Sequence, residues 1–584
     1  MTEQHTKTEE NLIDLEHHRG DTTPFDRLPS ALPPDADPIE QVDSLLDRPD
    51  AEEHIKSLNP HSLFRLVKRA GLDQGVDLIP YASPAQVQIF FDLDCWKKDR
   101  IDPQRMATWL AVIVADADDE HFHRVLRDTD PEVTALFFKK NFVAVEVIED
   151  DEIPQGMPDN VELSPDNAYA LVYPEDDDMA ALLRALVDRL YQVDQGLAWA
   201  LFEAVRWELT SDMEERAYRF RTSRLEEYGF VERTEALEVY ATISPVAFRR
   251  RWETGQIQDK PLLSPPKTLE VPAVLADNVD EEFFFFTILD SITDDEDLRR
   301  LSAELLTLTN RAMVADGIEP GEIETGREVV RRTTGYLSLG LEFVSRTDEE
   351  AARRALRTLG LRSLFQIGYS TAINLQKKVR ELEDRPTLSL IEGLPYSLLN
   401  PDEAALFEGL ADVRPTFARD RESFELFCTQ EQIDLAALRI GLVAFKQLWL
   451  FGVTNHSVEE LANMVYEGVL LNEPDTVSFD TFFATALLTQ ILDDNPAIRG
   501  LTTTELRAVP NVLRDRPWSD DPLGYFEPVI GPMLVELPPE TTGLATRWLR
   551  QTLDWLIDEL APVTGFDGPE PYLELLLVAH PATG

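Results

Sequence analysis

Four helix-start signals within about eighty residues constrain the fold of this chain more than any other feature. In each, a residue with a short polar side chain precedes a proline: Asn59-Pro60, Ser83-Pro84, Asp102-Pro103 and Asp130-Pro131. The side-chain oxygen can cap the free N–H groups of a helix, and proline at the first helical position loses no hydrogen bond because it has no N–H. The starts are 24, 19 and 28 residues apart, so we expect an irregular array of short helices rather than a strict repeat.

The apolar pattern along the chain indicates the same fold class. Behind Asp102, five apolar residues recur at helical spacing: Met106, Trp109, Leu110, Ile113 and Val114. Two short runs, 143–148 and 169–173, read as strands that flank a loop with prolines and a glycine, and they predict a small β-hairpin. The predicted fold is mainly α, an irregular multi-helix array of helical domains with small β-hairpin elements.

Shifts in composition divide the 584 residues into six segments. Residues 1–50 are polar and acidic, contain several prolines and lack periodicity, so we expect them to be disordered. The remaining predicted segments are a helical repeat-like module (55–142), a β-hairpin followed by a helical module (143–260), a proline-rich linker (261–280), a helical domain (281–510), and a C-terminal linker, helix and possible short strand (511–584).

The formal net charge of −53 limits the partners that we expect. A surface this negative repels nucleic-acid backbones and anionic lipid headgroups, so the sequence argues against nucleic-acid and membrane binding. The longest apolar runs, such as 440–453 with Lys446 inside it, fall short of the roughly 20 residues that span a bilayer. Acids spread through the chain favour solubility or salt adaptation, although an acidic surface can also bind a basic protein partner.

Two cysteines far apart and an N-terminus without a secretory pattern predict a cytoplasmic protein. The familiar catalytic, nucleotide-binding and calcium-binding motifs are missing from the sequence, so we expect no cofactor and assign no catalytic residue. Weak metal candidates are His121 and His123 beside three acids, and the pair Asp92 and Asp94. An acidic helix start with solvated histidines explains the first group equally well.

Other clusters also have a functional and a structural interpretation. Arg249-Arg250-Arg251 is a weak anion-binding candidate, although such clusters usually pair with a protein's own acids. In the stretch 83–106, a helix that is apolar nearly all round predicts that Cys95 is a buried core residue and that Asp102 caps the next helix. A structural turn then explains every residue of this stretch except Asp92 and Asp94.

Two blocks carry a resemblance to a known family: ASPAQVQIFFDLDCWKKDRIDPQRMATWL, and AVRWELTSDMEERAYRFRTSRLEEYGF at 204–230. With these blocks the chain resembles an uncharacterised bacterial family that is known only as a domain of unknown function, from about residue 55 onward. The resemblance implies no activity, cofactor or catalytic residue. Residues 59–141 are also similar in style to the cytoplasmic helical repeats of bacterial magnesium transporters, which implies a helical array that supports protein contacts.

The sequence therefore favours a non-enzymatic interaction or scaffold protein that uses a helical surface to bind a protein partner, in an oligomeric state that the sequence does not reveal. The alternative is an enzyme, a hydrolase or transferase, with an interdomain pocket. A polar pocket with convergent ionisable groups and shifted pKa values would favour the enzyme, and a long shallow groove would favour the scaffold.

Overall fold

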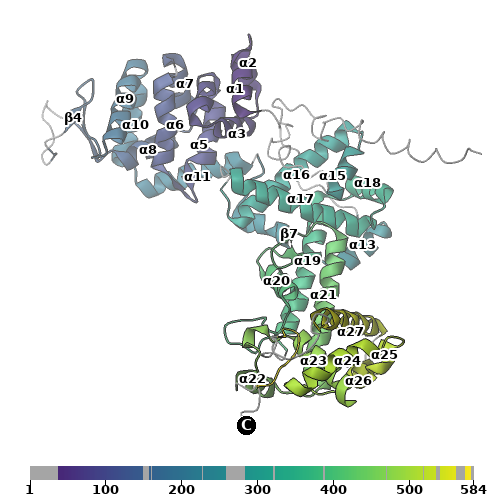
Figure 1. Cartoon of the computed structure of the whole chain (residues 1–584). Helices are drawn as coiled ribbons and strands as arrows, with labels where there is room; N and C mark the ends of the chain where they lie inside the picture. Colours follow the sequence, from purple (N-terminus) through teal and green to yellow (C-terminus); the bar gives the residue numbers. More distant parts are fainter. Residues whose placement is uncertain are drawn as a thin grey trace, which may run out of the picture. The chain divides into compact units, whose positions relative to one another are not determined.

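The computed structural model (Figure 1) describes residues 37–116, 118–148, 157–158, 161–226, 228–257, 283–319, 323–385, 388–467, 470–516, 518–534, 539–560 and 573–580. The chain forms two compact units, Met1–Ile367 and Gly368–Gly584. The division falls inside one long helix, α19 (Leu361–Glu383). The fold class predicted from the sequence is confirmed, because the described chain is mainly helical with only small antiparallel sheets.

The N-terminal unit is built from many short helices and a few very short strands. Its elements before α19 are α1 (Pro38–Leu46), α2 (Ala51–Ser57), α3 (Pro60–Ala70), α4 (Leu72–Gly75), η2 (Val76–Tyr81), α5 (Pro84–Asp94), β1 (Trp96–Lys97), β2 (Arg100–Ile101), α6 (Pro103–Asp116), α7 (Asp119–Asp128), α8 (Pro131–Asn141), β3 (Ala144–Val147), β4 (Glu162–Leu163), β5 (Tyr169–Val172), α9 (Asp177–Val193), α10 (Gln195–Trp207), α11 (Thr210–Glu226), α12 (Arg233–Ala236), η3 (Leu237–Tyr240), α13 (Pro245–Glu253), α15 (Phe284–Asp290), α16 (Asp295–Asp316), α17 (Ile323–Ser345) and α18 (Glu349–Thr358).

The C-terminal unit continues from the second part of α19. Its further elements are α20 (Pro401–Ala411), β6 (Thr416–Ala418), β7 (Phe424–Leu426), α21 (Gln430–Leu448), η4 (Trp449–Val453), α22 (Val458–Tyr466), η5 (Pro474–Thr476), α23 (Phe479–Asp493), α24 (Thr503–Asp515), α25 (Pro522–Tyr525), α26 (Glu527–Leu534) and α27 (Pro539–Leu560). β6 and β7 form an antiparallel pair, and α27 packs against both α21 and α23.

All four predicted helix starts are confirmed. Helices α3, α5, α6 and α8 begin at the predicted prolines, and the residue before each proline accepts a hydrogen bond from a backbone N–H of the first turn. At α5, Ser83 and Gln86 also form a reciprocal capping box. Because α3 packs against α5, α5 against α6 and α6 against α8, the capped helices form one array with a continuous apolar core.

The predicted hairpin is also confirmed, with one addition. β3 pairs antiparallel with β5, so that Val145 lies opposite Leu171. The two-residue strand β4 pairs with the other side of β5, which gives the order β3-β5-β4. The sequence did not predict β4, because both of its residues are exposed and two residues show no alternation.

The prediction that residues 1–50 are disordered is wrong for the end of that segment. Helix α1 occupies Pro38–Leu46, capped by the Asp37 side chain, and buries Val42 and Leu45. The start signal, a short polar residue before a proline, is the same as in α3, α5, α6 and α8, and the burial of these apolar residues stabilises the helix. Residues 1–36 and the predicted linker 261–280 lie outside the described residues, and the other predicted segment boundaries stay predictions.

Both ends of the predicted C-terminal segment 511–584 differ from the prediction. Its proline-rich beginning carries α25 and α26 rather than a linker. The possible short strand is present only as isolated bridges, in which Val578 pairs with Leu501 and Ala579 pairs with Leu470.

One helix of the described chain, Gln430–Val453, is long and apolar enough to cross a membrane by length and composition alone. It begins ten residues before the apolar run 440–453. Half of its most apolar window is buried inside the unit. A core helix passes the same test, so length and composition do not assign this helix to a membrane.

Candidate functional site

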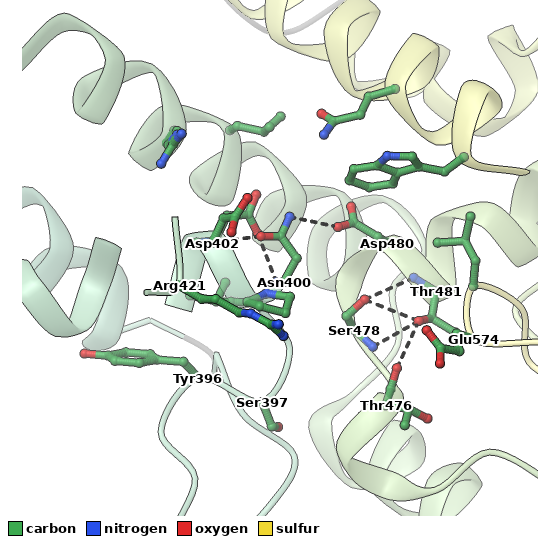
Figure 2. Close-up of a pocket in the computed structure, with 18 of the residues that line it drawn as sticks. Tyr396, Ser397, Asn400, Asp402, Arg421, Thr476, Ser478, Asp480, Thr481 and Glu574 are labelled. Atoms are coloured by element: carbon green, nitrogen blue, oxygen red, sulfur yellow. Dashed lines mark hydrogen bonds between the residues drawn. The ribbon is translucent and has the colours of Figure 1, made fainter. Parts of the chain in front are cut away.

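A pocket of about 1130 Å³ lies in the C-terminal unit (Figure 2). Its walls are the segment 396–403 at the start of α20, one face of α21, the segment 475–481 at the start of α23, one face of α27, and residues 574–575. Arg421, from the connection between β6 and β7, also lines it. Segments nearly 180 residues apart in sequence therefore meet around one cavity.

Two helices, α21 and α27, each supply one face to the wall. Leu435, Leu438, Arg439 and Leu442 recur at three- and four-residue spacing along α21, and so lie on one face of that helix. Arg547, Gln551, Trp555 and Asp558 recur in the same way along α27. The pocket thus has a partly apolar surface with charged groups around it.

Two helix N-termini fix the polar side of the pocket. The Asn400 side chain accepts from the Glu403 backbone N–H at 3.0 Å, and the Glu403 carboxylate accepts in return from the Asn400 backbone N–H at 3.3 Å. Ser478 and Thr481 cap α23 in the same reciprocal way (Figure 2). These caps hold Glu403 and Asp480, each within the first turn of its helix, in fixed positions.

A buried ion cluster lies behind this wall. The Nζ of Lys446 is 2.9 Å from an oxygen of Glu403 and 2.6 Å from Oδ1 of Asp480, and all three residues are at most 5 % exposed. The indole of Trp548 donates to Asp480 Oδ1 at 2.6 Å, and the Asn400 amide donates to Asp480 Oδ2 at 3.2 Å. Each charged group of the cluster is therefore paired and hydrogen-bonded, as buried charges require.

The cluster keeps its lysine charged. Burial lowers the pKa of Lys446, but the nearby carboxylates of Asp480 and Glu403 outweigh burial, so the pKa of Lys446 lies above its ordinary value. Burial raises the pKa of Glu403, while Lys446 opposes that rise. A lysine that stays protonated and is 1 % exposed cannot act as a nucleophile toward a ligand in the pocket.

The stretch 83–106 is a structural turn in this structure. Cys95 follows the last residue of α5 and is completely buried, and burial raises the pKa of its thiol well above the ordinary value. Asp102 caps α6 by accepting from the Gln104 N–H at 3.1 Å. Neither residue lies at the pocket.

The two aspartates that the turn did not explain hold helices together. Asp92, fully buried, accepts from Nε of Arg224 at 2.6 Å and from the Gln88 amide at 3.0 Å. Arg224 also pairs with Asp130 at 3.0 Å, so one guanidinium joins α5, α8 and α11. Asp94 pairs with Lys68 and accepts from the indole of Trp109 at 2.9 Å.

The histidine and arginine candidates are spread apart. His121 is buried on α7, whereas the neighbouring candidate His123 pairs with Asp194 at 2.9 Å. Arg249 donates to the Phe343 carbonyl at 3.2 Å, while Arg250 and Arg251 are exposed on α13. In the part of the chain that the structure describes, no group of three or more histidine, cysteine or acidic side chains is arranged to hold a metal ion.

Sequence reasoning missed the pocket and its ion cluster. The one signal was Lys446, the last lysine of the chain, which stands alone in an apolar run. A charged residue inside a core helix needs a buried partner, but nothing in the sequence identified that partner as Glu403 or Asp480, since they lie 43 residues before and 34 residues after the lysine.

A comparison with family models finds one match, which covers residues 31–579. No curated protein and no solved structure matches the chain, and the similarity to magnesium-transporter repeats is not shown. The family match includes both blocks that carried the resemblance, and it extends beyond them to nearly the whole chain. The chain therefore belongs to the family of unknown function described as DUF6178.

Proposed function

We propose that this protein is a non-enzymatic interaction protein of the cytoplasm, and that the helical surface it uses is the one formed by α20, α21, α23 and α27 around the pocket. The observation that carries the proposal is the buried cluster of Lys446, Glu403 and Asp480. Ionisable groups with shifted pKa values, which favour an enzyme, do converge at this pocket. The three groups of the cluster are engaged with each other, however, so the pocket has a rigid charged wall without a free nucleophile among them. Such a wall suits the selective binding of a ligand or of a group on a partner.

The test is a pair of tryptophan substitutions on α21. Leu438 is half-buried and lines the pocket, so Leu438→Trp places a bulkier side chain in the binding surface, whereas Leu448 is exposed on the same helix and does not line the pocket. We expect members of a small-molecule library, sorted by charge, to raise the melting temperature of the full chain and of Leu448→Trp but not of Leu438→Trp. If every compound that stabilises the full chain also stabilises both variants, the pocket is not the binding site.

The second candidate function is an enzyme of the hydrolase or transferase class, and the position of Glu403 favours it. Glu403 lines the pocket and burial raises its pKa, which are properties of a general acid. The measurement is turnover of ester, phosphoester, glycoside and acyl-donor substrates. Turnover by the full chain that is lost in Glu403→Gln, a change that keeps the helix cap, would replace the binding proposal with this one.

A further inference from the structure

We infer that the pocket of the C-terminal unit binds alkylammonium groups, in the first place a small diamine or polyamine. This inference rests on the proposed function, because it names the ligand of the same site. Seven carboxyl groups and three guanidinium groups line the pocket, and two of the carboxyl groups, those of Glu403 and Asp480, pair with Lys446 behind the wall. Five carboxyl groups therefore face three guanidinium groups. The pocket therefore has an excess of negative charge, and its volume of about 1130 Å³ is ample for a short aliphatic chain with charged ends.

Several carboxylates of the lining are available to a ligand. Asp402, Asp475, Asp558 and Glu574 are all exposed, and among the described residues none of them has an ion-pair partner within 4.0 Å. Of the three arginines, Arg439 donates to the carbonyl oxygens of two residues in and beside β6, both at 3.0 Å, Arg421 pairs with Glu422 at 3.5 Å, and Arg547 is exposed. A ligand that enters this pocket meets available negative charge from several sides.

An additional acceptor lies in the same wall. One oxygen of Glu559 accepts from the Leu575 backbone N–H at 3.0 Å, whereas its Oε2 is buried and has no hydrogen-bond partner among the described residues. A buried acceptor without a donor is costly, so a ligand with N–H groups would bind favourably there. An ammonium group supplies three such donors.

The apolar part of the lining suits the methylene chain of such a ligand. Leu435, Leu438 and Trp555 are partly exposed in the pocket. Methylene groups gain free energy by covering such a surface, and the indole face attracts a cation within about 6 Å. The combination of separated carboxylates with an apolar surface between α21 and α27 matches a chain that carries positive charge at both ends.

Calorimetric titration of the full chain with three six-carbon probes tests this inference. The probes are 1,6-diaminohexane, 1,6-hexanediol and hexanedioate, which share a chain length and differ in charge. We expect one diamine to bind per chain, with no saturable binding of the diol or the diacid. The double variant Asp402→Asn/Glu574→Gln should weaken diamine binding by about tenfold, because each carboxylate contributes one partly exposed charge contact.

The matched control is Glu408→Gln/Asp434→Asn, which removes the same charge from exposed positions of α20 and α21 outside the pocket lining. It should leave diamine affinity unchanged, whereas an equal loss in both double variants would mean diffuse counterion binding and would overturn the inference. Binding of the diacid instead of the diamine would also overturn it. If a compound of another class raises the melting temperature of Leu448→Trp but not of Leu438→Trp, the proposed function stands and only the ligand class is wrong.

A further arm identifies the source of the ammonium group. An end-blocked trilysine peptide carries the same chemistry as the side chains of a partner protein. Saturable diamine binding that is lost in the pocket double variant supports the free-amine ligand. Binding of the peptide in the pocket without binding of the diamine would overturn the small-molecule assignment and point to lysine side chains of a partner.

Discussion

Lys446 shows how a single residue sets the character of a site. An isolated ammonium group in a protein interior costs several kcal/mol, and here two carboxylates within 2.9 Å offset that cost. The ring of Trp548 stacks on the ring of Phe483, with 3.8 Å between their centroids, and the indole N–H of Trp548 donates to Asp480. The stability of the C-terminal unit therefore depends on a balance that one substitution can upset.

Replacement of this lysine by methionine should destabilise the C-terminal unit. Lys446→Met leaves two carboxylates close together in the interior, which costs about 3 to 5 kcal/mol in the free energy of unfolding. Urea unfolding of the full chain, followed by tryptophan fluorescence, measures the loss. The triple variant Lys446→Met/Glu403→Gln/Asp480→Asn, in which no charge remains, should recover at least half of it. A single variant as stable as the unaltered chain would contradict the buried cluster.

Cys95 should behave as a core residue. Because burial keeps its thiol protonated, a thiol reagent applied to the native protein should label the partly exposed Cys428 first and label Cys95 only as the protein unfolds. Cys95→Ala should cost about 1 kcal/mol through the small cavity that it leaves. In Cys428→Ala, rapid labelling should disappear. Rapid labelling that persists in this variant would show that Cys95 is accessible.

The contacts that could be predicted at this scale were local ones. Asp102 was predicted as a cap because its acceptor and the N–H groups that it binds lie within three residues of each other. The partner of Asp92 could not be predicted, because Arg224 lies 132 residues away. The partners of Lys446 are also distant in the sequence, so the pocket could not be predicted. The turn at 83–106 could be predicted, because its cap is a contact between near neighbours.

Helices and strands were predicted wherever a start signal and an apolar pattern coincided. α3, α5, α6 and α8 had both, and the pair β3 and β5 lies in two short apolar runs that flank a loop with prolines and a glycine. α1 was missed because the acidic composition around it outweighed the signal at Asp37. An element of two residues, such as β4, has too short a pattern to predict from the sequence and depends on the strand that it pairs with.

The turn before β5 contributes a stability that depends on pH, because it is held by the carboxylate of Asp166. Partial burial raises the pKa of Asp166, but hydrogen bonds from Ser164, Ala168, Gln195 and Trp199 outweigh this effect and lower it from 3.8 to about 2. The ionised carboxylate thus ties the turn before β5 to α10. Because the pKa is lower in the folded chain, this contribution to stability is complete above pH 3.8 and falls as the pH drops toward 2.

The substitution Asp166→Asn should therefore lower stability near neutral pH and flatten its decline between pH 3.8 and 2. Unfolding midpoints in urea across this pH range provide the measurement. Asp188→Asn, at an exposed position of α9, is the control and should leave the shape of the pH profile as it is in the unaltered chain. A profile for Asp166→Asn with the same slope as the control would contradict the assigned role.

The charge of the whole molecule sets its response to salt. Exposed arginines pair with carboxylates, as Arg184 does with Glu162 at 2.7 Å and Arg419 with Glu425 at 2.9 Å. Each exposed pair contributes about 0 to 1 kcal/mol and is weakened by salt. The net charge of −53 leaves many more acids than bases, so mutual repulsion outweighs these pairs.

Added neutral salt should therefore raise the melting temperature of the full chain. Differential scanning calorimetry from about 0.01 M to 1 M potassium chloride tests this, since the screening length falls from about 30 Å to 3 Å over that range. Sucrose at matched osmolality is the control for non-ionic effects. A melting temperature that falls as salt increases would show that local ion pairs dominate the electrostatics.

The bridge from Arg224 to Asp92 and Asp130 also has a consequence for how the protein is made. α5 leaves the ribosome before α11 does, and the 132 intervening residues take roughly 7 to 26 seconds to synthesise at typical rates. During that interval Asp92 has no guanidinium to pair with, so its burial is unfavourable and α5 cannot complete its packing. The first helices of the nascent chain therefore stay partly folded until α11 has been synthesised. During this interval their exposed apolar surface can bind chaperones or associate wrongly with other chains.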